Sequence, residues 1–427
     1  MKKALRFLRI LVLVSLAVIL VIPSTILAAT FIADSFYISA QSEEEVSPSI
    51  AYNSQRQEYL VVWYNDRTGC DDIRAQRLTK NGTLIGGPFY ISANAGCPTS
   101  VDKRYPDVAY DSTADQYLVV WEEYAASTHY SIKGRRVSGN GALIDDLADL
   151  TIRAAGAPTY DPAKPAVAYS STSDRYMVVY EEAWHPGPVW NIYGQMVVPS
   201  SGLTEGGQIN IAQNASGPLQ EADVAYNSHS NSYLVAWQQK PGGDWDVFGQ
   251  QVQGNGSLSG GSIILGYYTV DDKYPAVAAL PDSPTDNKFL VVWELYANSI
   301  DHDIYGILVA EDGTVGTDFG IATYGVNEAS PAIAGNNDNL QYFVTWRYDH
   351  SGTFKPIRGQ AVTYAGVLTG QLQQALPTDS DADNPAVAAG PVGDFLVAWQ
   401  DLRDTPSENI YGRLYGNRTY LPLVVRP

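Results

Sequence analysis

The sequence is poor in the residues that most often build reactive or metal-binding centres. Its 427 residues include 2 cysteines, 5 histidines and 3 methionines. Lysine and arginine number 27 against 46 aspartates and glutamates, which gives a net charge of −19. A surface this acidic repels nucleic acids and anionic membranes, so we exclude both as partners.

Motifs of several enzyme classes are absent as well. The chain has no Ser-His-Asp order, no phosphate-binding loop, no nucleophile elbow and no sialidase-type SxDxGxTW box. No segment has the apolar period of a helix, so we expect a β scaffold.

The first residues have the layout of a secretory signal. A basic leader, "MKKALRFLR", precedes the apolar run Ile10–Ile22, which is short for a membrane span. We predict a signal peptide over residues 1–29, whose removal leaves a net charge of about −23. Leu27 stands where a small residue is preferred, so an uncleaved N-terminal anchor is the alternative. We expect a monomer that is secreted or held at the cell surface.

One apolar five-residue segment, which we call the word, recurs through the chain. "YLVVW" at Tyr59–Trp63 returns at Tyr117–Trp121, and five near copies follow. Their terminal aromatics are spaced 58, 59, 57, 56, 53 and 53 residues apart. A period in the fifties with several short apolar segments per unit is typical of β-propeller blades. The terminal aromatics are Trp63, Trp121, Tyr180, Trp237, Trp293, Trp346 and Trp399.

Each unit contains four predicted strands. A "PxVAY" segment such as Pro106–Tyr110 precedes the word, and a "DIYG"-like segment follows it. Asn-Gly or Asp-Gly turns then lead to a fourth segment such as "FYIS". We therefore predict an all-β, seven-bladed β-propeller of four-stranded antiparallel blades over residues 30–416, followed by a tail over residues 417–427.

The array itself contains six fourth strands for seven blades. "SFYISA" at Ser35–Ala40 nearly duplicates "PFYISA" at Pro88–Ala93 and precedes the first unit. We predict that this N-terminal strand completes the last blade and closes the ring, which leaves no open blade edge. The C-terminal "YLPLVV" at Tyr420–Val425 is the alternative.

Both alternating faces of the word are apolar, which indicates a strand covered on both sides. We predict that its terminal aromatics pack between blades. A ring of aromatics that stack on sugars is the alternative.

Loops after the second and fourth strands of every blade project from the same end of the ring. The polar residues that differ between repeats are concentrated in these loops, and functional residues often lie in loops held by a rigid scaffold. We therefore expect the binding face at this end. The binding candidates are Asp66, Tyr124, Trp184, His185, Trp190, Trp245, His302, Asp349 and Asp401.

Carboxylates recur just after the word. A glycosidase needs two carboxyl groups roughly 5–10 Å apart, and the loop-rich face can supply them. If the protein is an enzyme, its acid and base come from Glu122, Glu123, Glu181, Glu182 and Glu294. The plainer interpretation is that these are solvated loop acids in an acidic chain.

Two smaller features concern a cation and a cross-link. "DSDADN" places Asp379, Asp381 and Asp383 at alternate positions, as at the start of a calcium loop, but lacks its glycine and glutamate. Calcium is therefore the one cofactor we consider. Cys70 and Cys97 fall in loops at the same end of the first blade, and we predict a disulfide between them.

The unit "PxVAY…YLVVW…DIYGQRV…NGxL…FxIS" resembles the repeats of exported bacterial proteins of unassigned function that are taken to form β-propellers. The resemblance extends from about Phe36 to Tyr415. It implies the architecture and is silent on activity.

Three functions fit these observations. Uniform blades without a catalytic constellation favour a non-catalytic extracellular scaffold that binds a protein or glycan at the loop-rich face. A carbohydrate-active hydrolase or lyase is the alternative, and a structural component of the cell surface is the third. An inward-facing carboxylate pair on adjacent blades, with aromatics around the mouth, would favour the enzyme.

Overall fold

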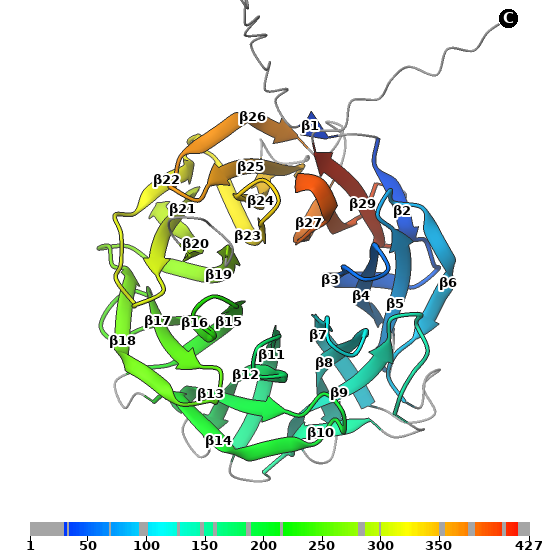
Figure 1. The fold of residues 1–427 in the computed structure, drawn as a ribbon. Coiled ribbons are helices and arrows are strands. Elements are labelled where there is room, and N and C mark those ends of the chain that lie inside the picture. The colour runs from blue at the N-terminus through cyan, green and yellow to red at the C-terminus, as the bar shows by residue number, and fades with distance from the viewer. Residues whose placement is uncertain are drawn as a thin grey trace, which may run out of the picture.

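The fold is a ring of seven antiparallel sheets arranged as blades around a central axis (Figure 1). This arrangement confirms the predicted seven-bladed β-propeller. The predicted leader and tail lie outside the part of the chain that the structure describes, and both remain predictions. The computed structural model describes residues 30–31, 34–67, 70–93, 101–125, 129–145, 149–156, 160–184, 189–213, 217–280, 287–298, 300–349, 355–374, 381–403 and 407–416.

Within each blade the chain runs outward from the axis. The innermost strands of blades one to seven are β3 (Glu44–Asn53), β7 (Val101–Asp111), β11 (Tyr160–Ser170), β15 (Leu219–Asn227), β19 (Asp272–Leu280), β23 (Asn327–Asn336) and β27 (Ala382–Ala389). The second strands are β4 (Glu58–Asp66), β8 (Gln116–Ala125), β12 (Arg175–Trp184), β16 (Ser232–Gln239), β20 (Lys288–Asn298), β24 (Gln341–Asp349) and β28 (Phe395–Asp401).

The two outer layers complete each blade. The third strands are β5 (Asp72–Thr79), β9 (His129–Ser138), β13 (Val189–Val197), β17 (Asp246–Gln253), β21 (Asp301–Ala310), β25 (Ile357–Thr363) and β29 (Asn409–Gly416). The outer strands are β6 (Leu84–Tyr90), β10 (Leu150–Arg153), β14 (Thr204–Ala212), β18 (Leu258–Gly266), β22 (Phe319–Ala322), β26 (Leu368–Gln374) and β2 (Phe36–Ser39). A short 3₁₀ helix, η1 (Pro391–Gly393), separates β27 from β28. None of the described residues forms a helix long and apolar enough to cross a bilayer.

The N-terminal strand closes the ring as predicted. Phe36 of β2 pairs with Gly412 of β29, and β1 (Thr30–Phe31) adds a further pairing at Gly416. Figure 1 shows these blue strands against the red C-terminal strand of blade seven. The segment Tyr420–Val425, the alternative for this place, lies outside the described residues.

The repeated word forms the core of every blade. All seven terminal aromatics of the word are 0% exposed, and each cluster of apolar side chains combines two neighbouring blades. Trp237 of blade four, for example, shares a cluster with Met177 and Val179 of blade three. The aromatics therefore pack between blades, as predicted, and none of them is available to stack on a sugar.

Four outer strands are longer than the sequence predicted. The strands β6, β14, β18 and β26 begin directly after their turns and contain a glycine at φ between 67° and 72°. Glycine tolerates this backbone and lets the strand continue across a bulge. A buried glutamine fills the bulge, as where Gln250 Nε2 donates to the carbonyl of Ser259 at 2.9 Å.

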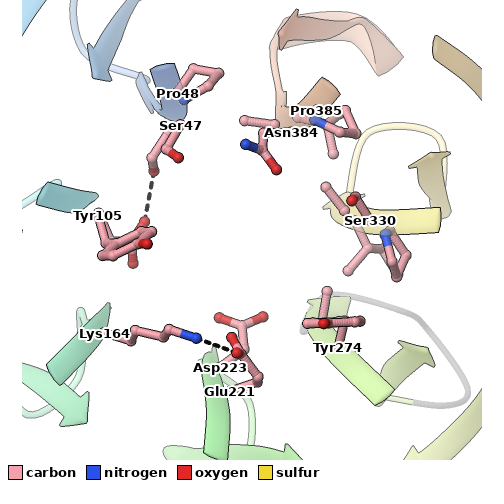
Figure 2. Close-up of a pocket in the computed structure, with 18 of the residues that line it drawn as sticks. Ser47, Pro48, Tyr105, Lys164, Glu221, Asp223, Tyr274, Ser330, Asn384 and Pro385 are labelled. Carbon is pink, nitrogen blue, oxygen red and sulfur yellow. Dashed lines mark hydrogen bonds and ion pairs between the residues drawn. The ribbon is translucent and has the colours of Figure 1, made fainter. Parts of the chain in front are cut away.

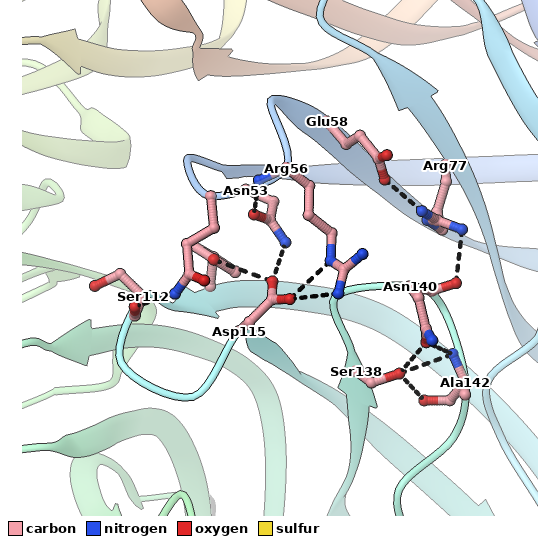
Figure 3. Close-up of polar contacts among 11 residues, drawn as sticks. Asn53, Arg56, Glu58, Arg77, Ser112, Asp115, Ser138, Asn140 and Ala142 are labelled. Carbon is pink, nitrogen blue, oxygen red and sulfur yellow. Dashed lines mark hydrogen bonds and ion pairs between the residues drawn. The ribbon is translucent and has the colours of Figure 1, made fainter.

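Hairpins at the end opposite the loop-rich face connect neighbouring blades. Figure 3 shows Asp115, in the β7–β8 turn of blade two, facing Asn53 and Arg56 of blade one. Asn53 Nδ2 and Arg56 Nε each donate to the Asp115 carboxylate at 2.7 Å. Beside them, Arg77 Nη1 donates to the carbonyl of Asn140 at 2.6 Å. These contacts fix the spacing between blades one and two.

Candidate functional site

A cavity of about 800 Å³ lies at the centre of the ring and is lined by the inner strands of all seven blades. It is formed by residues from the middle part of each inner strand, and the start of each inner strand faces the loop-rich end. Its size is in the range of small-molecule binding sites. Figure 2 shows side chains from every blade around this hollow.

One residue from each blade surrounds the cavity in an unusual backbone conformation. Each has φ between 46° and 53° and sits in a β-bulge where the inner strand slips register. A residue other than glycine in this region costs about 1–3 kcal/mol, and such strain is most common at functional sites. We call these seven residues the mouth ring: Ser47, Tyr105, Lys164, Glu221, Tyr274, Ser330 and Asn384.

Side chains from the preceding blade hold the backbone of the mouth ring. Glu122 Oε2 accepts a hydrogen bond from the N–H of Lys164 at 3.1 Å, and Glu181 Oε2 accepts one from the N–H of Glu221 at 2.9 Å. The same position in three other blades repeats the contact at 2.9–3.2 Å. We call these side chains latch residues: Glu122, Glu181, Gln238, Glu294 and Gln400.

Three of the five carboxylates predicted as an acid and base pool are therefore latch residues. The other two are paired elsewhere, Glu182 with Arg153 at 2.7 Å and Glu123 with Lys133 at 3.6 Å. The interpretation of the pool as solvated loop acids is wrong for Glu122, Glu181, Glu182 and Glu294, which are at most 6% exposed. The second strands continue past the word and carry these side chains into the blade.

Burial changes the acidity of the latch carboxyl groups. Loss of water raises the pKa of Glu181 to about 8, with Lys164 acting against the shift. Burial also raises the pKa of Glu122. A neutral carboxyl group still accepts a hydrogen bond through its carbonyl oxygen, so protonation leaves the latch intact.

Two carboxylates of the cavity wall were not predicted. Asp107 Oδ2 accepts from the N–H of Val167 at 2.7 Å, and Asp223 Oδ2 accepts from the N–H of Val277 at 2.8 Å. Burial raises the pKa of Asp223 to about 7, and the charge of Asp107 adds to the shift. Burial raises the pKa of Asp107 as well. The cavity wall thus carries two carboxyl groups on blades two and four, which are separated by blade three, whereas the enzyme hypothesis drawn from the sequence had asked for a pair on adjacent blades.

The mouth ring adds an ion pair and two aromatic rings. Lys164 Nζ pairs with the carboxylate of Glu221 in the next blade (Figure 2). Tyr105 and Tyr274 are 40% and 43% exposed and stand on either side of this pair in blade order. Exposed tyrosines beside hydrogen-bonding groups offer both apolar faces and polar edges to a ligand.

None of the binding candidates that fall within the described residues lines the cavity. Trp184 and Asp66 are exposed on the loop-rich face, and Trp184 Nε1 donates to the hydroxyl of Tyr193 at 3.2 Å. Trp190 is partly buried on β13. Tyr124 packs on the ring of Tyr130.

The remaining candidates are engaged in local contacts. Trp245 lies 5.8 Å from Lys240 Nζ. His302 Nδ1 lies 2.7 Å from Glu294 Oε1. The carboxylates of Asp349 and Asp401 bind the guanidinium groups of Arg347 and Arg403. His185 lies outside the described residues.

The predicted calcium loop and disulfide stay predictions. Asp381 pairs with Lys355 and Asp383 with Arg347, whereas Asp379 lies outside the described residues. In the described ranges no three acidic, histidine or cysteine side chains form a group suited to a metal ion. Cys70 is 1% exposed, and Cys97 lies outside those ranges.

The sequence did contain a signal for the mouth ring. In each repeat the residue before the "PxVA" segment varies, while the segment itself is nearly constant. Ser, Tyr, Lys, Glu, Tyr, Ser and Asn occupy this position in blade order. A variable residue before a nearly constant segment indicates that all blades share the strand, while the side chain at the variable position differs in function from blade to blade.

The fold and this cavity define a seven-bladed β-propeller with a ligand-sized central site. No family model and no curated protein sequence matches the chain. A protein of unknown function from Dyadobacter fermentans is similar in structure, with a TM-score of 0.54 and 10% identity over 92% of this chain and 100% of that chain.

Two similar structures are enzymes that act on sialic acids. The NanB sialidase from Streptococcus pneumoniae has a TM-score of 0.51 and 10% identity, covering 90% of this chain and 70% of that chain. The intramolecular trans-sialidase from Ruminococcus gnavus has a TM-score of 0.50 and 9% identity, covering 90% and 96%. At these identities the likeness establishes the fold alone.

These comparisons correct the leading functional prediction. A non-catalytic scaffold was expected because the blades are uniform and no catalytic motif is present. That expectation is corrected: two of the similar structures are named as a sialidase and a trans-sialidase, which agrees better with the alternative function, a carbohydrate-active enzyme.

Proposed function

We propose that the protein is an exported carbohydrate-active hydrolase or lyase whose substrate enters the central cavity from the loop-rich face. The observation that carries this proposal is the pair Asp107 and Asp223, which face a cavity of about 800 Å³ with Tyr105 and Tyr274 at its mouth. A carboxylate pair is the usual equipment for cleaving a glycosidic bond.

The environments of the two carboxyl groups give them different roles. Asp223, with a pKa of about 7, keeps a proton on a large fraction of molecules at neutral pH. This is what a general acid needs to protonate a leaving oxygen. Asp107 accepts from Ser49 Oγ at 2.6 Å and from the N–H of Val167, and these two hydrogen bonds oppose the burial that raises its pKa. Asp107 then acts as the base or nucleophile.

The similar sialidase structures support the general class of chemistry, while the sequence departs from them in detail. The chain lacks the SxDxGxTW box. We accordingly assign the reaction to carbohydrate cleavage and leave sialic acid out of the assignment. The predicted signal over residues 1–29 supports a secreted or cell-surface location, and a glycan is the expected partner.

The experiment is a hydrolysis screen of the mature chain against polysaccharides and oligosaccharides, with and without calcium. We expect turnover that falls at least 100-fold in Asp107→Asn and in Asp223→Asn. The matched controls are Glu122→Gln and Glu181→Gln, whose amides still accept the latch hydrogen bond and should preserve turnover. Absence of turnover on every substrate, or full turnover in both cavity variants, would overturn the proposal.

A further inference from the structure

The mouth ring is the part of the cavity in which the blades differ from one another. We infer that the mouth ring selects uncharged saccharide chains and rejects sugars that carry a carboxylate. This inference rests on the proposed function of the same cavity and adds the class of substrate. It also separates this protein from the similar structures, which are named for sialic acid chemistry.

The charges of the cavity carry the first part of the argument. The described residues that line it include one cation, Lys164, and three carboxylates, Asp107, Glu221 and Asp223. Lys164 is already paired with Glu221. A carboxylated sugar would enter a cavity whose one described cation is already paired, and burying such a charge unpaired is costly. No arginine lines the described cavity, so the bidentate recognition of a carboxylate is missing as well.

The uncharged groups of the mouth ring carry the second part. Tyr105 and Tyr274 flank the ion pair and are both more than one third exposed, and aromatic rings of this kind suit the C–H surfaces of a sugar. On the remaining arc, Ser330, Asn384 and Ser47 follow one another in blades six, seven and one (Figure 2). Hydroxyl and amide groups both donate and accept, which matches the hydroxyls of a neutral sugar.

The backbone of the mouth ring is fixed before any ligand arrives. Five of its seven N–H groups donate to latch residues of the preceding blade. A site held in this way spends little free energy on ordering, and it adapts poorly to a ligand of the wrong charge. The rigid backbone of the mouth ring and the carboxyl groups of the cavity wall together therefore select ligands by their charge.

The first test measures binding, so that it does not depend on turnover. The unmodified protein, which keeps all three cavity carboxyl groups, would be titrated calorimetrically with uncharged hexasaccharides of β-glucan, mannan and xylan, and with oligogalacturonate and sialyllactose. We expect at least one uncharged chain to bind tenfold or more tightly than either carboxylated probe. Equal or tighter binding of a carboxylated probe, or no binding of any probe, would overturn the inference.

The second test changes the charge of the mouth ring. Glu221→Gln releases Lys164 from its ion pair, and we expect affinity for oligogalacturonate to rise at least tenfold. The double variant Lys164→Gln, Glu221→Gln should lose this gain. Glu205→Gln is the matched control, because Glu205 pairs with Arg175 on the outer edge of blade three and its loss should leave binding unchanged. A thermal melt of each variant verifies folding, and an unchanged affinity in folded Glu221→Gln contradicts the inference.

The third test addresses the tyrosines. Tyr105→Ala and Tyr274→Ala should each weaken the binding of the preferred uncharged chain about tenfold. Tyr267→Ala, a 71% exposed tyrosine outside the cavity lining, should not. Neutral selectivity without turnover of any glycan would refute the proposed function and leave the inference standing. Turnover of a carboxylated glycan in preference to neutral ones would refute the inference and leave the function standing.

Discussion

The carboxylate of Glu181, on the second strand of blade three, accepts a 2.9 Å hydrogen bond from the backbone N–H of Glu221 in blade four. Gln238 makes the equivalent contact to Tyr274 one blade further on, also at 2.9 Å. The side chain at this position therefore has to accept a hydrogen bond, but it does not have to be charged. A glutamate that looks catalytic in the sequence serves to hold the residue that lines the cavity.

Replacing Glu181 by glutamine should stabilise the protein at alkaline pH. The folded-state pKa of Glu181, about 8, lies above the ordinary value of 4.5, so folding takes up a proton between these values. Its contribution to stability is complete below pH 4.5 and is lost as the pH rises toward 8. Thermal melts from pH 5 to 9 should show that the stability of Glu181→Gln relative to the wild type increases as the pH rises. At pH 8 the increase in the free energy of unfolding should be on the order of 2 kcal/mol. Parallel curves for the two proteins would contradict this assignment.

The buried tryptophans should differ in their dependence on the indole N–H. Trp293 Nε1 donates to Asp272 at 3.0 Å, whereas Trp121 Nε1 has no hydrogen-bond partner among the described residues. Trp293→Phe should therefore cost about 1–3 kcal/mol more than Trp121→Phe. The reason is that it leaves Oδ1 of the buried Asp272 carboxyl group without its indole donor, while Oδ2 keeps the N–H of Tyr268. Urea denaturation of both variants measures the difference. Equal losses would mean that packing alone sets the cost.

Asp115 should be a stabilising link between blades one and two. Asp115→Ala removes an acceptor from Asn53 and Arg56 and places alanine at φ 50°, so we expect a loss of about 2 kcal/mol. Asp115→Asn keeps the turn and one acceptor, and it should cost less than half as much. Denaturation midpoints of the pair give the comparison. If Asp115→Asn lost more than half the stability that Asp115→Ala loses, the charge of Asp115 would matter more than the turn.

The pH dependence of turnover should report Asp223. With a pKa of about 7 in the folded protein, the general acid loses its proton above neutrality, and kcat/KM should fall about tenfold per pH unit there. In Asp223→Asn this alkaline limb should disappear. The remaining activity should be highest on aryl glycosides, whose leaving groups need little protonation. An unchanged alkaline limb in the variant would assign the proton to another group.

The number of blades and the closure of the ring could be predicted because both depend on counting. Seven copies of the word and a displaced "FYIS" at Phe36–Ser39 leave one arrangement in which every blade is complete. Periodicity also revealed the buried aromatics, because a strand that is apolar on both faces has to be covered.

The cavity could not be predicted from the same pattern. The strands β8 and β12 continue to Ala125 and Trp184, beyond the word that was taken as their end, so Glu122 and Glu181 became buried latch residues. Asp107 stood inside an apolar "PDVAY" segment and looked like ordinary variation. Only the bulge before it turns this stretch of β7 toward the axis, and a bulge of this kind leaves no mark in an apolar pattern.

The pairing of Phe36 with Gly412 has a consequence for how the protein is made. The strand that completes the last blade precedes its partner strand by roughly 375 residues. At a synthesis rate of about 5–20 residues per second, this strand waits on the order of half a minute without its partner. An interrupted chain never covers the apolar segment Phe36–Ser39 and so exposes it to chaperones and proteases. The last blade is therefore complete only in a chain that contains both β2 and β29.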